Sequence, residues 1–396
     1  MNIRILHIFT SNYKRRFGGP IFDWKFAFSK WDDPSVEHYV LDYDQKRPVR
    51  AMQAFSFEIS SSQVMSSRIE RILWIFSLLF YLRKFKREYD ILHFHVLHWA
   101  GFLACTWAKR KKIPTIYQSV LQNSDTPSNV NNQRQGKLKG KLLQNFSAIL
   151  AISHVLSEDY LQHGFSNDKV YTLMNSVETD VFYPVSSPDE KSKLRQKHNL
   201  PQDATILLFT GSIIHRKGVD ILLKSFLDVS RYFPDLFLVL VGPNSKNENP
   251  SLDIGFINEL NNLLADAAVD DRVKFTGLIK DREILAELNR AADIFVFPSR
   301  NEGLGNVVLE AMASGLPVII SDLPPLRNVI IDGINGKVVP IDDVEKLSQI
   351  IIQLLKDPYL SEKLKINARD YIENNHSFSE WQSRLVQIYN EVWGAN

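Results

Sequence analysis

The feature of this sequence that most constrains its fold is a repeated alternation of short β-rich runs with stretches of helical spacing. Strands that alternate with helices predict βαβ units, and βαβ units predict parallel sheets. The alternation occurs in each half of the chain, so we expect two α/β lobes. The expected strands span 3–9, 91–94, 115–117, 148–152 and 170–173 in the first half, and 205–210, 236–241, 273–276, 294–297 and 318–321 in the second.

The length of 396 residues also favours two lobes, because one hydrophobic core rarely organises so long a chain. The stretch Tyr183–Asp203 combines prolines with polar and charged residues, which is typical of a connection between lobes. We therefore expect a first lobe over 1–182, a second over 203–375, and a last segment over 376–396 that contains a helix. Sheets of this kind bind ligands at the carboxyl ends of their strands, in a crevice.

Composition describes a folded chain without a strong charge bias. Hydrophobic residues make up 44% and charged residues 23%, and a net charge of +2 does not require a nucleic-acid partner. Cys105 is the only cysteine, so no internal disulfide forms and a reducing, cytoplasmic compartment is expected. Met1–Thr10 lacks the order of a secretory signal, and the most apolar run, Ile72–Leu82, has half of the roughly 20 residues that a membrane span needs.

The densest chemical signal is Ser299–Glu310, which follows one expected strand and leads into a helix. Gly303 and Gly305 let the backbone turn tightly, and the first amides of the helix offer a site for an anion such as a diphosphate. Glu302 should lie in the loop. Glu310 should lie about two turns into the helix, where it could accept hydrogen bonds from the vicinal hydroxyls of a ribose. The alternative is a helix start at which the dipole simply favours acidic residues.

Basic and imidazole side chains follow two other expected strands. Arg216 and Lys217 could neutralise phosphate, although such a pair is also common on solvated surfaces. His93 and His95 should point to one face, because strand side chains alternate. With His98 they could form a metal site, but no nearby acidic or cysteine ligand completes one. A structural hydrogen bond is a further alternative for a histidine at the end of a strand.

Together these segments resemble the retaining glycosyltransferases of the GT-B fold, and in particular glycosyltransferase family 4 (glycosyl transferases group 1). The family signature is a Glu, seven residues and a second Glu, which Glu302 and Glu310 match. Ala313–Val318 resembles the strand entry that follows in the family, and His376–Trp381 resembles its final segment. The resemblance implies an α/β fold of two Rossmann-like parallel-sheet lobes facing across a cleft, with a C-terminal helix that crosses back to the N-terminal lobe.

The resemblance also implies roles for individual residues. Lys217 matches the family lysine that binds the donor diphosphate, whereas Ser212 stands where the family commonly has an arginine. His95 matches the histidine that contacts the donor sugar. The implied catalytic residues are His95, Glu302 and Lys217, and the implied donor-binding residues are Gly18, Gly19, Ser212, Arg216, Lys217, Gly303, Leu304, Gly305, Asn306 and Glu310.

The implied function is transfer of a hexose, with retention of anomeric configuration, from a UDP- or GDP-sugar to a saccharide or lipid-linked saccharide in cell-surface polysaccharide biosynthesis. The first lobe would bind the acceptor and the second the nucleotide sugar. The resemblance implies no cofactor and no metal. Two alternatives stay open: a nucleotide-sugar epimerase of the same fold, and a catalytically silent binding subunit, which the departure at Ser212 suggests.

A basic and aromatic region suggests a location for this activity. Arg68–Arg87 combines aromatic residues with a basic end, and Lys137, Lys139 and Lys141 add a second basic stretch. Such a segment could lie on the anionic inner face of the cell membrane and face a lipid-linked acceptor. The alternative is an ordinary helix that covers the following strand, with its basic end in solvent.

Overall fold

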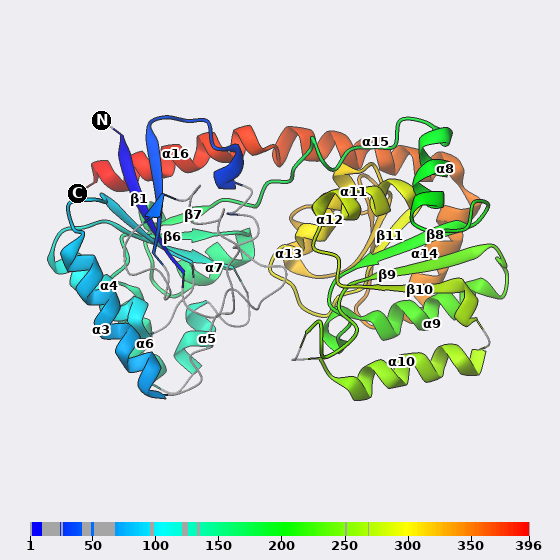
Figure 1. Cartoon of the computed structure of the whole chain (residues 1–396), viewed down its shortest axis with the longest axis horizontal. Helices are drawn as coiled ribbons and strands as arrows, with labels where there is room; N and C mark the ends of the chain where they lie inside the picture. Colours follow the sequence, from blue (N-terminus) through cyan, green and yellow to red (C-terminus); the bar gives the residue numbers. More distant parts are fainter. Residues whose placement is uncertain are drawn as a thin grey trace. The chain divides into compact units, whose positions relative to one another are not determined.

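The computed structural model divides into two compact units, each with its own sheet (Figure 1). Unit 1 comprises Met1–Asn175 and Ser379–Asn396, and unit 2 comprises Ser176–Phe378. The final helix therefore belongs to the first unit, although it is last in the sequence. The structure describes residues 2–9, 24, 27–41, 49–50, 68–95, 99–120, 126–132, 135–249, 252–267 and 269–395.

The described part of unit 1 contains a seven-stranded sheet in the order β3-β2-β1-β4-β5-β6-β7. Its strands are β1 (Ile3–Ile8), β2 (Val36–Leu41), β3 (Val49–Arg50), β4 (Ile91–Phe94), β5 (Thr115–Ser119), β6 (Ala148–Ala151) and β7 (Val170–Thr172). Neighbouring strands run parallel except at the edge, where β3 is antiparallel to β2. Strand β1 lies inside the sheet, between β2 and β4, and the strand order reverses between β1 and β4.

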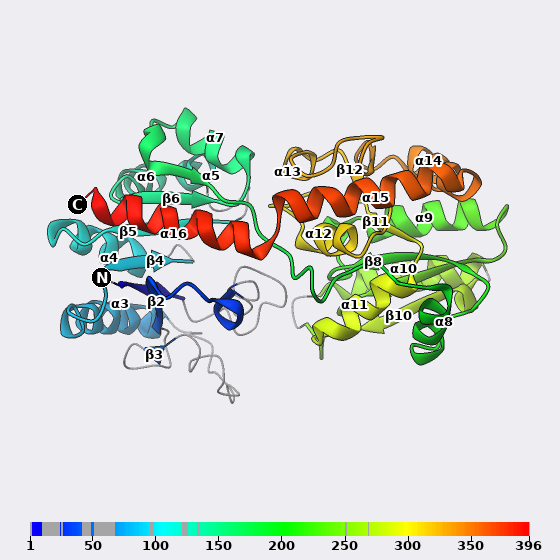
Figure 2. The ribbon, with the colours of Figure 1, turned by 90° about the horizontal axis from the view of Figure 1, so that it is seen from above.

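Helices cover both faces of this sheet (Figure 2). They are α3 (Arg68–Lys84), α4 (Trp99–Arg110), α5 (Pro127–Asn132), α6 (Gly136–Leu143), α7 (His154–Gln162) and α16 (Phe378–Gly394), with a 3-10 turn, η2 (Asn167–Lys169). Among the described residues, none of the helices combines the length and the apolar character that crossing a bilayer requires.

The two faces of the unit 1 sheet differ because strand side chains alternate. Leu6 of β1 and Leu92 of β4 enter an apolar core that also holds buried side chains of α3 and α4. His7 and His93, the next residues along the same strands, are Cα partners in the ladder and lie on the opposite face. Helix α16 packs on that opposite face, where the Tyr389 hydroxyl meets the His93 ring.

Unit 2 has a six-stranded parallel sheet among its described residues, in the order β10-β9-β8-β11-β12-β13. The strands are β8 (Thr205–Thr210), β9 (Leu236–Val241), β10 (Val273–Gly277), β11 (Ile294–Phe297), β12 (Val318–Ser321) and β13 (Lys337–Val339). The helices are α8 (Pro188–Lys197), α9 (Val219–Ser230), α10 (Ile254–Ala267), α11 (Arg282–Ala291), α12 (Asn306–Ala313), α13 (Pro324–Arg327), α14 (Val344–Lys356) and α15 (Pro358–Asn375), with 3-10 turns η3 (His215–Lys217) and η4 (Asp270–Arg272).

The α/β class and the two largely parallel sheets are confirmed, and all the expected strands are present. Strands β2, β3 and β13 were not predicted. In β2, Glu37 and His38 interrupt the apolar residues, whereas β3 and β13 span only two and three residues. The terminal helix, expected near Ser379–Trp393, spans Phe378–Gly394.

The expected connection between the lobes is different in the structure. The boundary between the units lies at Asn175, and much of Tyr183–Asp203 forms helix α8 of unit 2. Proline suggested a break in regular structure, but Pro188 occupies the first turn of α8, where its missing N–H costs nothing. Ser187 caps this helix by accepting a hydrogen bond from the amide of Glu190.

Arg195 anchors α8 to the rest of unit 2. Its guanidinium is buried and donates hydrogen bonds to the carbonyl oxygens of Ala291, Gln202 and Ala204. The same group lies 2.7 Å from a carboxylate oxygen of Asp293. One side chain thus satisfies three carbonyl groups and a carboxylate.

We expect Arg195→Met to lower the free energy of unfolding of unit 2 by about 2–4 kcal/mol, because these acceptors would lose their partner. The matched control is Arg231→Met, whose guanidinium is 74% exposed and pairs with Asp228 only at 3.7 Å. It should cost less than about 0.5 kcal/mol. Urea denaturation of the full chain measures both, and equal losses would contradict the anchoring role.

Candidate functional site

A cluster of polar side chains lies at the carboxyl end of each sheet, where the strand order reverses. The order reverses between β8 and β11 in unit 2 and between β1 and β4 in unit 1. Parallel sheets bind ligands at such switch points, because the loops that leave the two strands diverge and open a crevice. The fold therefore marks two candidate positions, one in each unit.

In unit 2 a glycine lets the loop after β8 approach the loop after β11. Gly218 ends η3 and precedes α9 with a φ of 68°, in the left-handed region that favours glycine. A Cβ atom at this position would lie 1.9 Å from the carbonyl oxygen of Pro298. Only a residue without a side chain allows so close an approach, which brings Lys217 to the β11 loop.

Glu302 lies at the centre of the unit 2 cluster. Its side chain is 7% exposed. One carboxylate oxygen, Oε1, lies 2.7 Å from Nζ of Lys217 and 3.2 Å from a guanidinium nitrogen of Arg216. The Ser299 hydroxyl donates to the same oxygen at 2.7 Å. The buried carboxylate is therefore neutralised by two cations, of which Arg216 remains 41% exposed.

Lys217 is held in a largely apolar setting. Its ammonium lies 4.8 Å from the centre of the Phe297 ring, in cation–π contact. The pKa of Lys217 is lowered, chiefly by burial, and the neighbouring Glu302 carboxylate opposes that shift. A desolvated ammonium of this kind is stabilised by any further anion that reaches it.

Arg300 fixes the two loops relative to each other. Two of its guanidinium nitrogens each donate to Asp220 at 2.8 Å, and a third donates to Asp342 at 2.6 Å. The guanidinium also donates to the carbonyl oxygen of His215, and the backbone amide of Arg300 donates to the carbonyl oxygen of Arg216. These contacts hold η3, and with it the basic pair, beside the β11 loop.

A short loop, Gly303–Gly305, joins Glu302 to the first turn of α12. Gly305 is the residue before the helix, with a φ of 78°, and Asn306 begins it. The side chain of Leu304 is buried, as is Gly303. Any contact that Leu304 makes with a ligand would therefore come from its backbone. The amides and the dipole of this helix start add positive potential next to the basic pair.

Glu310 is buried on α12 and pairs with an arginine that sequence reasoning missed. Arg282, at the start of α11, lies 3.0 Å from Oε1 of Glu310 and also pairs with Glu178. Its guanidinium stacks over the Phe182 ring at 4.9 Å. The pKa of Glu310 is raised, chiefly by burial, while Arg282 acts in the opposite direction.

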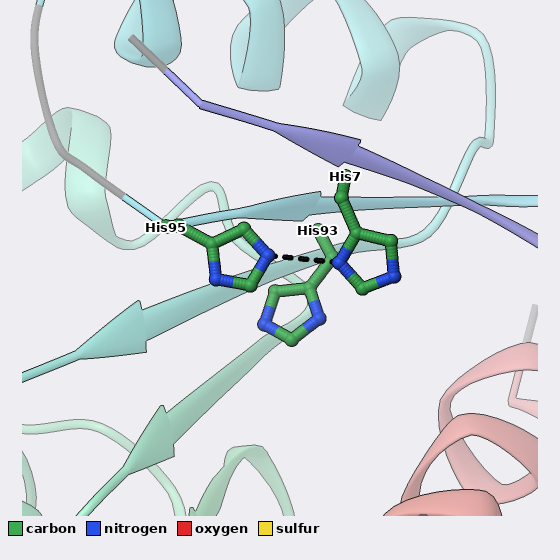
Figure 3. Close-up of side chains that lie close together, drawn as sticks. All are labelled: His7, His93 and His95. Carbon is green, nitrogen blue, oxygen red and sulfur yellow. Dashed lines mark hydrogen bonds between the residues drawn. The ribbon is translucent and has the colours of Figure 1, made fainter. Parts of the chain in front are cut away.

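The unit 1 cluster consists of four buried histidines: His7 on β1, His38 on β2, His93 on β4 and His95 directly after β4. Figure 3 shows His7, His93 and His95 gathered together. The rings of His93 and His95 stack with centres 4.3 Å apart, so the two side chains share one face, as their alternation predicted.

Three of these histidines, together with Gln118 and Trp24, form a continuous hydrogen-bonded chain. His38 and His7 are joined at 2.8 Å, and His7 and His95 at 2.8 Å. The other ring nitrogen of His95, Nδ1, lies 2.6 Å from Oε1 of Gln118. The Trp24 indole donates to that same oxygen at 2.7 Å. Both nitrogens of His95 are therefore engaged within the protein.

Burial keeps these histidines neutral. It lowers the pKa of both His38 and His95 to about 3, and the pKa of His7 and His93 well below the usual value. His93 uses Nδ1 for a hydrogen bond of 2.9 Å with Tyr389. Its Nε2 atom has no hydrogen-bond partner among the described residues.

The cluster also has the composition of a potential metal site. His7, His93 and His95 each place a ring nitrogen within 4.8 Å of the others. This group contains no carboxylate or thiolate, and a direct hydrogen bond of 2.8 Å already joins two of its members. Nitrogen ligands of a tetrahedral zinc ion lie about 3.3 Å apart, given Zn–N bonds of about 2.0 Å. The geometry favours hydrogen bonding, and metal-independent chemistry stays a prediction.

Of the remaining expected site residues, the structure describes Ser212 but not Gly18 or Gly19. Ser212 follows β8, and its carbonyl oxygen accepts a hydrogen bond from the amide of Ile214 at 2.9 Å. Gly18 and Gly19 lie outside the described residues, so their expected part in binding stays a prediction. His98 also lies outside them.

The sequence contained partial signals for the residues that were missed. His7 lies inside the expected strand 3–9, and Gln118 directly follows the expected strand 115–117; a buried polar side chain at such a position is unusual and needs a partner. Arg300 lies inside the segment that was singled out for its glutamates. No local pattern marks Arg282, because its partners come from other parts of the chain.

Sequence models of two families match this chain, one in each unit. The model "Glycosyltransferase Family 4" matches residues 39–181, and "Glycosyl transferases group 1" matches residues 190–371. Together these matches cover most of both sheets.

Individual relatives match over similar regions. A D-inositol 3-phosphate glycosyltransferase of Xylanimonas cellulosilytica is 29% identical over 76% of this chain and 72% of that protein. A GDP-mannose-dependent alpha-(1-6)-phosphatidylinositol monomannoside mannosyltransferase of Mycolicibacterium smegmatis is 28% identical over 54% of this chain and 55% of that protein. The capsular polysaccharide biosynthesis glycosyltransferase CapM of Staphylococcus aureus is 25% identical over 61% of each chain.

Solved structures share the fold at lower identity. A glycosyltransferase of Rickettsia africae matches with a TM-score of 0.76 and 18% identity, over 99% of this chain and 98% of that one. HepE of Anabaena in complex with UDP-glucose matches with a TM-score of 0.76 and 17% identity, over 98% of this chain and 100% of that one. Both likenesses establish the fold.

The histidine cluster predicts that acid destabilises unit 1. Because the folded-state pKa values are depressed, the unfolded chain binds more protons as the pH falls below about 6.5, and stability is lost toward pH 3. By pH 5 each buried histidine should cost about 2 kcal/mol. Urea denaturation at pH 7 and pH 5 measures the loss.

The matched pair of variants is His38→Asn and His154→Asn. His38→Asn removes one buried titrating group and should make the loss between pH 7 and pH 5 smaller by about 2 kcal/mol. His154 is exposed at the start of α7, so its replacement should leave the slope unchanged. Equal stability of the unaltered protein at the two pH values would show that the histidines are not buried as described.

Proposed function

This chain belongs to glycosyltransferase family 4 and is a glycosyltransferase, and from that premise we propose that it transfers a hexose with retention of anomeric configuration. The donor is a nucleotide-diphospho-sugar of the UDP or GDP type. The acceptor is a saccharide or a lipid-linked saccharide. The observation that carries the proposal is the buried pair of Lys217 and Glu302 at the unit 2 switch point, beside the start of α12.

The unit 2 cluster suits the departure of a nucleoside diphosphate. As the bond between the sugar and the phosphate breaks, negative charge grows on the phosphate oxygens. Lys217 and Arg216 lie beside the loop Gly303–Gly305 and the helix start at Asn306, an arrangement that supports binding of an anion there. Because Lys217 is desolvated, its interaction with that growing charge is stronger than it would be in water.

The positive charge near the donor has fewer contributors than the family pattern suggests. Ser212 replaces the common arginine, so Lys217 and Arg216 carry the task with the helix amides. We propose that Ser212 contributes a hydroxyl in place of a charge. Arg300 keeps the two cations in place without itself being a ligand.

Retention follows from attack on the face that the phosphate leaves. The bond from the anomeric carbon to the diphosphate breaks, a bond to the acceptor oxygen forms on the same side, and a phosphate oxygen takes the acceptor proton. This scheme needs no general base from the protein. Glu302 and His95 hold sugar hydroxyls, and Glu310 accepts hydrogen bonds from the ribose of the nucleotide.

The names of the relatives support the donor and acceptor classes. One relative is named for GDP-mannose and a phosphatidylinositol mannoside, another for capsular polysaccharide, and one neighbouring structure contains UDP-glucose. We propose that the transfer takes place in the cytoplasm, at the inner face of the cell membrane. An epimerase of the same fold and a silent subunit are less well supported, because the relatives are named as transferases.

We further propose that unit 1 contacts an anionic membrane through an outer surface of α3. Leu78 and Leu82 of this helix are buried, whereas Phe76 is 67% exposed and Phe80 is 58% exposed. The ammonium of Lys84 lies 6.0 Å from the Phe80 ring. One face of α3 covers the sheet, and the other presents aromatic rings beside basic groups, which supports the proposed contact with a membrane.

Helix α6 also presents exposed basic and apolar side chains. It contacts α4, which in turn contacts α3. Lys137 and Lys141 are exposed on α6, and Leu138 is 50% exposed. Aromatic and aliphatic side chains among lysines are typical of a surface that binds the interface of an anionic bilayer.

For the transferase, we expect purified protein to release nucleoside diphosphate from one member of a panel of UDP- and GDP-sugars. Lys217→Met should lower kcat by about 10²–10³-fold, because a cation that stabilises the leaving phosphate is lost. Lys224→Met is the matched control, since Lys224 is exposed on the next helix, α9, and should leave kcat unchanged. His95→Ala and Glu310→Ala should also be impaired while remaining folded.

The same assay separates the alternatives. Anomeric assignment of the product by NMR should give the configuration of the donor, and turnover should persist in EDTA. An inverted product would exclude the front-face scheme, and loss of turnover in EDTA would exclude the metal-independent one. If no donor binds in calorimetry, the silent-subunit alternative replaces the enzyme.

For the membrane, we expect the full chain to sediment with vesicles of phosphatidylglycerol and phosphatidylcholine more than with phosphatidylcholine alone. The double variant Phe76→Ser with Phe80→Ser should lower the affinity for the anionic vesicles at least about tenfold. It removes two aromatic rings that are exposed in the free protein and would become buried in the bilayer. Tyr232→Ser in unit 2, where Tyr232 is 76% exposed, is the control. Equal binding by both variants would contradict the proposed surface.

A further inference from the structure

The hydrogen bonds that join the histidines of unit 1 all run in one direction, from donor to acceptor. Trp24 and Gln118, at one end of this series, determine that direction. The indole N–H of Trp24 can only donate, so the Gln118 atom 2.7 Å away must be the carbonyl oxygen. That oxygen lies 2.6 Å from Nδ1 of His95 and can only accept there too. The proton of the neutral His95 ring is therefore on Nδ1.

Each later step of the chain follows from the one before. Because Nδ1 of His95 carries the proton, its Nε2 is an acceptor, and His7 must donate to it from Nδ1 at 2.8 Å. The Nε2 atom of His7 is then an acceptor, and His38 must donate to it from Nδ1 at 2.8 Å. All three rings carry their proton on Nδ1.

This polarity is costly to reverse. Turning the Gln118 amide over would bring its NH₂ group against the Trp24 N–H, leaving a buried donor without an acceptor. An unsatisfied buried donor costs about 1–3 kcal/mol. Gln118 is 5% exposed and Trp24 is 1% exposed, so water has little access to compensate. The amide at one end thus determines the tautomers of three imidazoles.

We propose that Gln118, supported by Trp24, is a positioning residue that presents Nε2 of His95 to the donor sugar as a hydrogen-bond acceptor. The inference rests on the proposed function, in which His95 holds a sugar hydroxyl. A donor hydroxyl can then insert between the two rings: it donates its proton to Nε2 of His95, and its oxygen accepts the hydrogen bond that the His7 N–H made to Nε2. A sugar position that can only accept a hydrogen bond gains nothing from His95.

The surroundings of the chain contain further titratable groups. His95 faces His7 from β1 and His93 from β4, and His38 from β2 follows one step away. Tyr389 from α16 contacts His93. A proton added to any of these rings would remove an acceptor, so the polarity requires that the rings stay neutral.

The tautomer can be measured without turnover. Nitrogen-15 NMR of histidine-labelled full-length protein distinguishes a protonated Nδ1 from a protonated Nε2. We expect His95 to show protonated Nδ1 in the unaltered protein and to lose this preference in Gln118→Met, which has no acceptor at this position. The control is Gln162→Met, an exposed residue of α7. Protonated Nε2 on His95 in the unaltered protein would overturn the proposal.

Activity and binding test the positioning role. Calorimetry with UDP, GDP, UDP-glucose and GDP-mannose should show that Gln118→Met binds the nucleoside diphosphates as before and binds the matching nucleotide sugar at least about tenfold more weakly, the loss of one hydrogen bond. Equal loss of both ligands would point to a structural defect and overturn a positioning role, as would no loss of either.

Gln118→Glu provides the conservative variant. A carboxylate still accepts from Trp24 and His95, so the tautomer and the affinity for the sugar should be restored at high pH. The negative charge favours the protonated ring and raises the pKa of His95, so sugar binding should fall as the pH is lowered, in a range where the unaltered protein is flat. A flat profile in Gln118→Glu would contradict the proposal. Protonated Nδ1 in a protein that binds no nucleotide sugar would instead refute the proposed function and leave the polarity intact.

Discussion

The arrangement of both candidate sites depends on one property of parallel sheets, which is that every strand delivers its following loop to the same edge. Because the strand order reverses once in each sheet, the residues at the starts of two loops meet there before the loops diverge, and no third strand lies between them. In unit 2 this meeting is close enough to require Gly218, and Arg300 fixes it with contacts to both sides. In unit 1 it brings His7 and His95 within hydrogen-bond distance. Strand order therefore determines which residues can meet at each site.

The two units meet the cost of burying polar groups in different ways. In unit 2 the buried acidic groups are paired with basic ones, Glu302 with Lys217 and Glu310 with Arg282. In unit 1 the buried imidazoles are uncharged and share protons along a chain. Paired charges respond strongly to a charged ligand, whereas a neutral chain can offer direction without net charge.

Much of the fold could be predicted from the sequence because buried parallel strands give compact apolar runs. Glu302, Lys217 and their glycines could also be found, since each follows such a run and the spacing is local. The rest depends on pairing between distant segments. The register that places His7 opposite His93 and the contact of Arg282 with Glu310 leave no local pattern. Helix α8 was missed for another reason: Pro188 is compatible with a helix only at its first turn, and composition does not show where a helix begins.

The position of α16 at the end of the sequence determines the order in which the two units can be completed during synthesis. Its residues belong to unit 1, yet every residue of unit 2 is translated before them. Until α16 emerges from the ribosome, the histidine face of the first sheet lacks Tyr389 and Trp381, which pack against His93 and Trp24. Unit 1 is thus completed only after unit 2 has been translated. A nascent chain would have to keep this uncovered face from aggregating during that interval, and a break in synthesis within α16 would leave unit 1, rather than unit 2, incomplete.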